Sequence, residues 1–299
     1  MSEFNKNPID VVLPWLNPTA KWFSEYKKYC EDENPCRVRD LNTMQPTLKG
    51  IIKNLSWVRY IWLIVYDEEQ IANLDWEELK NEKIKIIYHK DIIPAEFLPN
   101  FNSLIPTIFF FNKEEIAENI LFMNDDMLFN HLMKENDYFE NDLPVHHLTL
   151  REGSRSNTFL CTWDYILKTT EQLFNKLTSK KYVCDTWHTP CPISKTMCKF
   201  IDYKFHKELY NSCKEAKIRR KTSITLIELS YWLSEAYGKI ISKPIYNRLK
   251  RKVLVLKDTT TVQEIKNCLQ YDIVCVNDSE WLVKNTETIK EAILNVFGK

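Results

Sequence analysis

The residues best suited to chemistry in this chain are Asn124, Asp125 and Asp126, which directly follow the apolar run 120–123. An apolar run bounded by polar residues is typical of a buried strand in an α/β sheet. Ligands of such sheets gather at the carboxyl ends of the strands, where these three side chains are expected. Two adjacent carboxylates in a crevice repel each other unless a cation balances them, and hard oxygen ligands suit Mg²⁺ or Mn²⁺ shared with phosphates. A plain turn is the competing interpretation, because Asn and Asp are common turn residues.

The elements that must position this triplet alternate in type along the first half of the chain. Buried strands alternating with helices favour a mostly parallel sheet. After residue 142 the pattern becomes mainly helical, with two strands near the end. The expected strands are 9–15, 60–66, 84–89, 120–123, 253–256 and 272–278. The expected helices are 19–33, 47–55, 105–111, 163–177, 195–216, 222–237 and 287–296.

Composition narrows the function class. The chain has 299 residues, 44% of them hydrophobic and 27% charged, which is ordinary for a globular protein. Its 41 Lys and Arg residues equal its 41 Asp and Glu residues, which argues against a general nucleic-acid binder. Only four glycines occur, and this excludes a glycine-rich phosphate loop.

Cysteine usage and hydropathy bear on the compartment. Nine scattered cysteines fit a reduced, cytoplasmic chain better than a disulfide framework. The group Cys184, His188, Cys191 and Cys198 lacks the paired spacing of structural zinc sites. The start has no apolar signal region and no run is long enough to span a membrane. The basic run 248–252 suggests peripheral attraction to an anionic inner membrane face, although a solvated charged face is the commoner explanation.

Four segments, in order, carry a family resemblance. Residues 9–17 (IDVVLPWLN) resemble the first conserved region of the Stealth proteins, and 274–278 (VCVND) resemble the fourth. His188-Thr-Pro-Cys-Pro together with Arg220 resembles the third region. The second region is matched by RVRD at 37–40, WVR at 57–59, HKDIIP at 89–94, LPNFNS at 98–103 and FMNDD at 122–126. Stealth proteins are sugar-1-phosphate transferases of bacterial capsule synthesis, related to the lysosomal-enzyme GlcNAc-1-phosphotransferase.

The resemblance implies a GT-A-like, Rossmann-type α/β fold in one domain, residues 1–299. Residues 1–145 would form the half that binds nucleotide-sugar and metal. Residues 146–299 would form a mostly helical half, with a returning strand, that completes the cleft. The implied reaction moves a hexose-1-phosphate or N-acetylhexosamine-1-phosphate from a UDP-sugar to a hydroxyl of a glycan acceptor, such as a lipid-linked oligosaccharide, and releases UMP.

The resemblance also implies roles for particular residues. Asp125 and Asp126 would hold Mg²⁺ or Mn²⁺, with Asp278 completing or orienting the ligand set, unless Asp278 only forms a turn. His188 would be the base or a phosphate contact, because an imidazole titrates near neutral pH. Arg220 is favoured over its neighbour Arg219 as the phosphate clamp.

A further group is expected around the donor. Arg39 and Asp40 are candidates for the nucleotide or diphosphate, and Asn124, at the strand end beside Asp125, is a further donor-binding candidate. Helix capping is the competing explanation for Asn102 and Ser103, and core packing is the competing explanation for Trp15. The remaining candidates are Trp15 and Asn17 for the uracil, and Asn102 and Ser103 for the sugar.

Two other functions fit the same residues. A metal-dependent GT-A glycosyltransferase would use the same carboxylates but release UDP. A non-catalytic nucleotide-sugar or glycan-binding protein is the second alternative, because Asn17, Thr43 and Thr107 depart from the Stealth pattern. A phosphotransferase would release UMP and a glycosyltransferase would release UDP. A binding protein would bind the donor tightly without turnover.

Overall fold

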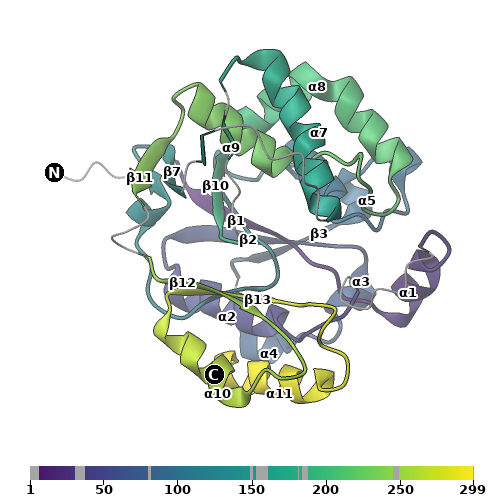
Figure 1. Ribbon diagram of the computed structural model, residues 1–299, viewed down its shortest axis with the longest axis vertical. Coiled ribbons are helices and arrows are strands. Elements are labelled where there is room, and N and C mark those ends of the chain that lie inside the picture. Colours follow the sequence, from purple (N-terminus) through teal and green to yellow (C-terminus); the bar gives the residue numbers. More distant parts are fainter. Residues whose placement is uncertain are drawn as a thin grey trace.

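The protein is a mixed α/β structure built around one mostly parallel sheet (Figure 1). Helices cover one face of this sheet, and a helix followed by a second, smaller sheet covers the other. The computed structural model describes residues 7–30, 38–79, 82–148, 151–152, 161–180, 182–183, 188–244 and 249–298.

The central sheet has five strands. All neighbouring pairs are parallel except the edge strand β10, which runs antiparallel to β4. The amino end of β10 therefore lies beside the carboxyl ends of the parallel strands. The spatial order is β10 (Cys191–Ser194), β4 (Asn119–Phe122), β1 (Ile9–Pro14), β2 (Val58–Val65) and β3 (Ile84–Tyr88).

The inner strands are apolar on both faces because both faces are covered. In β1, Val12 faces one core cluster while Val11 and Leu13 face another. In β4, Phe122 and Leu121 divide between the two clusters in the same way. This is the alternation that a pleated strand imposes, and it explains why both strands are largely apolar in the sequence, apart from the buried Asp10 and Asn119.

Helices that come mostly from the second half of the chain cover one face of the sheet, the upper one in Figure 1. The longest of them, α8, begins directly after β10, and the side chain of its N-cap Ser194 accepts a hydrogen bond from the backbone N–H of Met197. The helices of this layer are α6 (Ile105–Phe109), α7 (Thr162–Leu177), α8 (Lys195–Glu215) and α9 (Leu226–Ala236).

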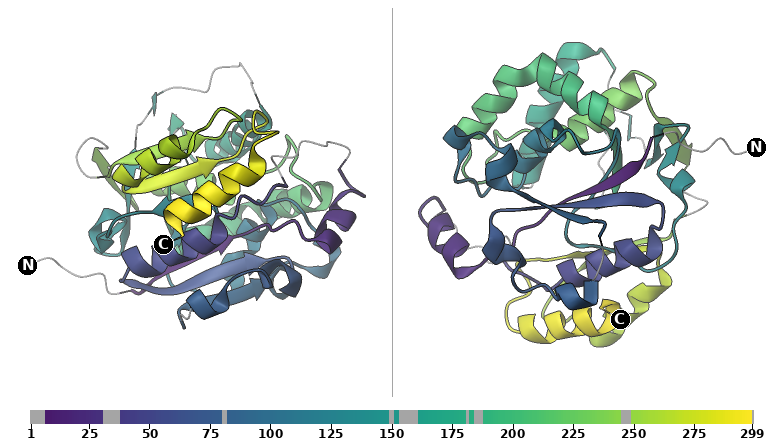
Figure 2. Two further views of the ribbon diagram at one scale, coloured as in Figure 1. Left: turned by 90° about the horizontal axis from the view of Figure 1, so that it is seen from below. Right: turned by 180° about the vertical axis from the view of Figure 1, so that it is seen from behind.

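The opposite face is covered first by α2 (Met44–Asn54) and then by a second sheet of order β12–β13–β5 (Figures 1 and 2). Gly50 of α2 lies against β5, and a Cβ there would come within 3.0 Å of the Phe129 carbonyl oxygen. The close packing of helix and sheet thus depends on glycine. The second sheet and its outer helices are β5 (Met127–Phe129), β12 (Arg251–Val255), β13 (Ile273–Asn277), α10 (Val262–Asn267) and α11 (Thr286–Phe297).

A buried carboxylate holds the amino end of the central sheet together. Asp10 of β1 is fully buried and accepts hydrogen bonds from Arg59 at 2.7 and 2.9 Å and from Trp62 Nε1 at 2.8 Å. The backbone N–H groups of Tyr60 and Ala117 donate to it as well. A buried charge is tolerable only when it is paired and hydrogen-bonded in this way.

Short elements complete the chain. They connect the layers or extend them at the periphery, and α1 projects from one end of the molecule in Figure 1. They are α1 (Ala20–Tyr26), α3 (Glu68–Ile71), α4 (Trp76–Leu79), α5 (His89–Ile92), β6 (Phe139–Glu140), β7 (Leu143–Leu148), β8 (Arg151–Glu152), β9 (Tyr182–Val183) and β11 (Ile241–Pro244).

The predicted α/β class with mostly parallel sheets is confirmed. The strands expected at 253–256 and 272–278 exist, but they pair with each other in a separate sheet, where the second of them also pairs with Met127–Phe129. The helix expected over 19–33 ends at Tyr26, and 31–33 lies outside the described residues, as does Arg248 of the basic run. Within the described part of the chain, no helix is long and apolar enough to cross a membrane.

Candidate active site

Two adjoining cavities open at the carboxyl edge of the central sheet. The first has a volume of about 610 Å³ and the second about 310 Å³. Their shared wall contains the acidic pair that follows β4, so the pair lies where the two cavities meet. The residues that line both cavities are Leu16, Phe101, Ser103, Asp125, Asp126, Arg219 and Asn277.

The backbone of the acidic pair is held between two elements that are distant in sequence. The Asp125 carbonyl accepts a hydrogen bond from Thr47 Oγ1 of α2 at 3.1 Å. The Asp126 carbonyl accepts one from the backbone N–H of Val276 in β13 at 2.8 Å. These bonds fix the turn between β4 and β5, and the two side chains remain at the wall of the cavities.

Negative charge accumulates at this point. Burial, followed by the charges of Asp126 and Asp40, raises the pKa of Asp125 well above its usual value. Burial also raises the pKa of Asp126 and that of Asp40. The Oδ1 atom of Asp126 is buried and accepts no hydrogen bond from any described residue. Carboxylates in this state fit a divalent cation, which would supply both the missing charge and the missing contact.

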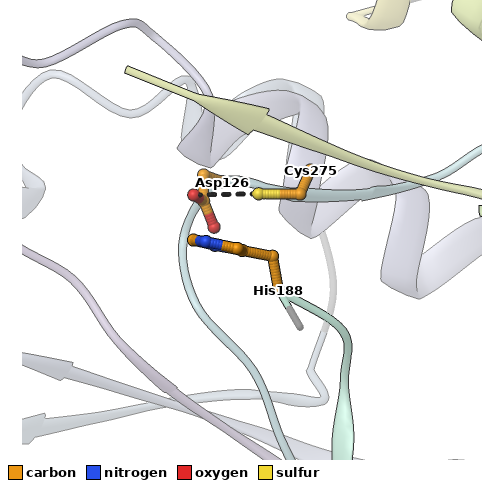
Figure 3. Close-up of side chains that lie close together, drawn as sticks. All are labelled: Asp126, His188 and Cys275. Atoms are coloured by element: carbon orange, nitrogen blue, oxygen red, sulfur yellow. Dashed lines mark hydrogen bonds between the residues drawn. The ribbon is translucent and has the colours of Figure 1, made fainter. Parts of the chain in front are cut away.

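His188 reaches the pair from a different strand. It lies three residues before β10, whose antiparallel direction brings it to the carboxyl edge. Its φ of 52° is uncommon for a residue other than glycine, and such strain concentrates at functional sites. One ligand atom each of Asp126, His188 and Cys275 lie within 4.8 Å of one another (Figure 3). The Cys275 thiol donates a hydrogen bond to Asp126 Oδ2 at 3.2 Å.

Of the two neighbouring arginines, the structure brings Arg219 to both cavities. Its guanidinium donates a hydrogen bond to Ser103 Oγ and lies 5.8 Å from the ring centroid of Trp163. Arg220 lines neither cavity, and its backbone N–H donates to Ser223 Oγ at 3.1 Å. The geometry therefore favours Arg219 where sequence spacing favoured Arg220.

Arg39 and Asp278 form an ion pair with 2.9 Å between Nε and Oδ2. Their side chains are only 10% and 12% exposed. Arg39 also donates to Thr286 Oγ1 at 3.0 Å, which anchors it to α11. Both line the second cavity, where the guanidinium of Arg39 balances the charge of the Asp278 carboxylate. The assignment of Asp278 as a metal ligand remains a prediction.

The other predicted donor-binding residues differ in their access to the cavities. Trp15, Asn102 and Asn124 line the first cavity, and Asn102 is held there by donating to Ser223 Oγ at 3.2 Å. Asn17 lines neither cavity. It is buried and exchanges hydrogen bonds of 3.0 and 2.7 Å with Gln70, so its contacts are structural.

Sequence reasoning assigned no role to several lining residues. Glu228, in the first turn of α9, is 2% exposed and lines the first cavity. A single Glu within the apolar stretch LIELSYWL was a signal for a buried functional carboxylate. His89 is buried in the same wall, and burial lowers its pKa to about 4. Trp22 and Tyr26 line the second cavity as a stacked aromatic pair with centroids 4.9 Å apart.

The fold and the site together define an α/β protein with an acidic, two-chambered cleft at the carboxyl edge of a parallel sheet. Residues 37–146 match the family model of Stealth protein CR2, conserved region 2. A capsular polysaccharide phosphotransferase WcwK of Streptococcus pneumoniae is 25% identical over 99% of this chain and 96% of its own length. The exopolysaccharide phosphotransferase cps2G of Lactiplantibacillus plantarum is 22% identical over 98% of this chain and 95% of its own length.

The chain therefore contains conserved region 2 of the Stealth proteins at residues 37–146, and by homology over nearly its full length it is a phosphotransferase. Among solved structures, the bifunctional glycosyltransferase WbbM in its apo form matches 99% of this chain and 51% of its own, at 9% identity and a TM-score of 0.35. That value is too low to bear on the fold, so the GT-A-like topology stays a prediction.

Proposed function

We propose that this protein transfers a hexose-1-phosphate or N-acetylhexosamine-1-phosphate from a UDP-sugar to a hydroxyl of a glycan, in capsule or exopolysaccharide synthesis. The acceptor oxygen forms a bond to the β-phosphorus, and the bond from that phosphorus to the bridging oxygen breaks. UMP leaves with the bridging oxygen, and the product is a phosphodiester. The names of the relatives supply the reaction class.

The observation that carries the proposal is the position of Asp125 and Asp126 where the two cavities meet, opposite His188 and Arg219. A nucleotide diphosphate sugar has its charged diphosphate in the middle, with a base at one end and a sugar at the other. The second cavity offers Tyr26, which stacks on the fully buried Trp22, as the aromatic contact for the base. The larger first cavity has room for the sugar and the acceptor.

Each side chain has a task that its contacts support. Mg²⁺ or Mn²⁺ held by Asp125 and Asp126 would neutralise the diphosphate of the donor. Arg219, fixed by Ser103, presents a guanidinium that can bind phosphate oxygens in a bidentate manner. His188 accepts the proton of the acceptor hydroxyl as the oxygen attacks. Positioning and charge stabilisation supply most of the rate in phosphoryl transfer.

Product analysis by mass spectrometry tests the proposal. The protein is incubated with Mg²⁺, a panel of UDP-sugars, and oligosaccharide acceptors with and without a lipid anchor. We expect acceptor-dependent UMP and an acceptor heavier by a sugar plus a phosphate. UDP with an acceptor heavier by sugar alone would instead identify a conventional glycosyltransferase. Donor binding without turnover would identify a non-catalytic binding protein.

The role of the imidazole is tested separately. We expect His188→Ala to lower turnover by about 10²–10⁴-fold, the usual contribution of a general base, while donor affinity changes little. His206→Ala is the matched control, because His206 is exposed on α8 and lines neither cavity. Equal activity of the two variants would remove His188 from the mechanism.

A further inference from the structure

A second kind of metal site is built into the wall of the first cavity, and it includes a sulfur and an imidazole nitrogen, which Mg²⁺ avoids. Ligand atoms of Asp126, His188 and Cys275 lie within 4.8 Å of one another, although they come from three separate segments (Figure 3). We propose that these side chains bind Zn²⁺, and that bound Zn²⁺ inhibits the transfer reaction. The binding stands on its own geometry, and only the inhibition rests on the proposed function.

The distances suit a tetrahedral ion. Zn²⁺ binds oxygen, nitrogen and sulfur at about 2.0–2.3 Å, which places neighbouring ligand atoms about 3.3–3.8 Å apart. Cys275 Sγ and Asp126 Oδ2 are already 3.2 Å apart. The His188 side chain is exposed and can adjust by rotation. Three protein ligands leave a fourth position, which opens into the first cavity because Asp126 and His188 line it.

An independent observation points to a cation at Asp126. One carboxylate oxygen, Oδ2, accepts the Cys275 thiol, whereas Oδ1 is buried with no hydrogen-bond partner among the described residues. A buried polar atom without a partner is costly, and most such atoms in proteins are satisfied. A metal ion bound at this carboxylate would satisfy it.

The donor set selects the ion. Sulfur and imidazole nitrogen favour Zn²⁺ and Co²⁺, whereas Mg²⁺ requires oxygen ligands in octahedral geometry. When the metal binds, the S–H bond of Cys275 breaks, its proton goes to water, and a sulfur–metal bond forms without any change of oxidation state. Zn²⁺ and Mg²⁺ would compete for Asp126, and Zn²⁺ would also occupy the lone pair of His188 that the reaction needs.

Cobalt is the probe of choice because a thiolate bound to Co²⁺ gives a near-ultraviolet charge-transfer band. We would titrate the reduced 299-residue chain with Co²⁺ in the presence of excess Mg²⁺. We expect the band to saturate at one ion per chain and to disappear when Zn²⁺ is added. Cys275→Ser should lack the band, whereas Cys268→Ser, which removes a buried cysteine outside both cavities, should retain it.

A band that persists in Cys275→Ser overturns the site. Should Cys275→Ser fail to fold, His188→Ala decides, because its exposed side chain is dispensable for folding. That variant should bind Co²⁺ roughly tenfold more weakly or worse, and unchanged affinity overturns the site as well.

The inhibition is measured as turnover with Mg²⁺ at increasing Zn²⁺. Cys275→Ser should keep a larger fraction of its own Zn²⁺-free turnover than the wild-type protein keeps. Zn²⁺ binding without inhibition overturns the inhibitory role. A complete lack of turnover without Zn²⁺ overturns the proposed function and leaves the cobalt result standing.

Discussion

Replacing Asp125 by asparagine should stabilise the metal-free protein while it abolishes activity. Asp125 is partly buried beside two other carboxylates, Asp126 and Asp40, and burial and their charges raise its pKa. The folded protein therefore disfavours the charged form of the Asp125 carboxyl group. Asparagine has nearly the same shape and removes that charge.

The direction of the pH dependence follows from linkage. A carboxyl group whose pKa is higher in the folded than in the unfolded state stabilises the fold below its unfolded pKa, here near 3.8. That stability is lost as the pH rises through the folded pKa. Without metal, the wild-type protein should thus lose stability relative to Asp125→Asn as the pH is raised to neutrality.

The magnitude is modest but measurable. Each unit of pKa difference corresponds to about 1.4 kcal/mol, and relieving unfavourable charge at a functional site typically yields about 0.5–2 kcal/mol. For a chain of this size, about 1 kcal/mol shifts the Tm by about 2–4 °C. A cation at 100 times its Kd should stabilise the wild-type protein by about 2.7 kcal/mol. The order of the two melting temperatures should therefore reverse when metal is added.

The assay is thermal unfolding at pH 7.5 and at pH 5, with a chelator or with saturating Mg²⁺ or Mn²⁺. Glu287→Gln is the control, because Glu287 is a carboxylate with 81% of its side chain exposed. Its Tm should equal that of the wild-type protein in every condition. We expect Asp125→Asn to melt higher than the wild type with chelator, lower with metal, and with a smaller difference at pH 5.

A lower Tm of Asp125→Asn in the presence of chelator would refute the reasoning, because the carboxylate would then contribute stabilising contacts that outweigh its desolvation. A wild-type Tm that does not respond to either metal would refute the cation site itself. Asp126→Asn should act in the same direction. The double variant should gain less stability than the sum of the gains of the two single variants, since each change relieves the same repulsion.

Three other changes test separate parts of the structure. Arg219→Ala should weaken donor binding about 10–100-fold, the loss of one charged hydrogen-bonding contact, while Arg220→Ala has little effect in the same titration. Asp10→Asn should destabilise the fold by about 3 kcal/mol in urea unfolding, because it breaks the buried pair with Arg59; an unchanged midpoint would show that the pair is dispensable. Because His89 is buried in its neutral form, the free energy of unfolding of the wild-type protein should fall by about 3 kcal/mol between pH 6.5 and pH 4, where the unfolded chain binds a proton that the folded chain does not. The free energy of unfolding of His89→Gln should fall by less over this range.

The sequence was sufficient to predict the position of the acidic pair, because that position depends on local pattern. The apolar run before Asn124 is long enough to be a buried strand, and parallel strands share one carboxyl edge. Trp15 and His89 follow two other parallel strands, and both line the same cavity. Each of these placements requires only that a strand be recognised and its direction be known.

The placement of His188 and Asn277 depended on pairings that no local pattern specifies. β10 has only four residues and includes a proline, so its antiparallel pairing with β4 is not predictable from its own sequence. β5 leaves the central sheet after Asp126 and pairs with β13 instead. That pairing creates the second sheet and brings Cys275 to within hydrogen-bonding distance of the acidic pair.

Side-chain partnerships were the hardest to anticipate. Arg39 and Asp278 are 239 positions apart in sequence, and each alone is a plausible ligand for a substrate or a metal. Their ion pair follows only from the docking of α11 and β13 beside residues 38–41. The same applies to Arg219, whose direction is set by contacts with Ser103 and Trp163 rather than by its spacing in the chain.

The residues of the candidate site are divided between two parts of the chain. Conserved region 2, residues 37–146, contains the acidic pair and Ser103. His188 and Arg219 lie outside it, on segments that reach the edge through β10 and the helices of the upper layer. A chain that carries only region 2 would therefore keep the carboxylates and lose both His188 and Arg219. If the proposed roles are right, His188→Ala should impair transfer while metal binding at Asp125 and Asp126 is retained, whereas Arg219→Ala should weaken donor binding as well.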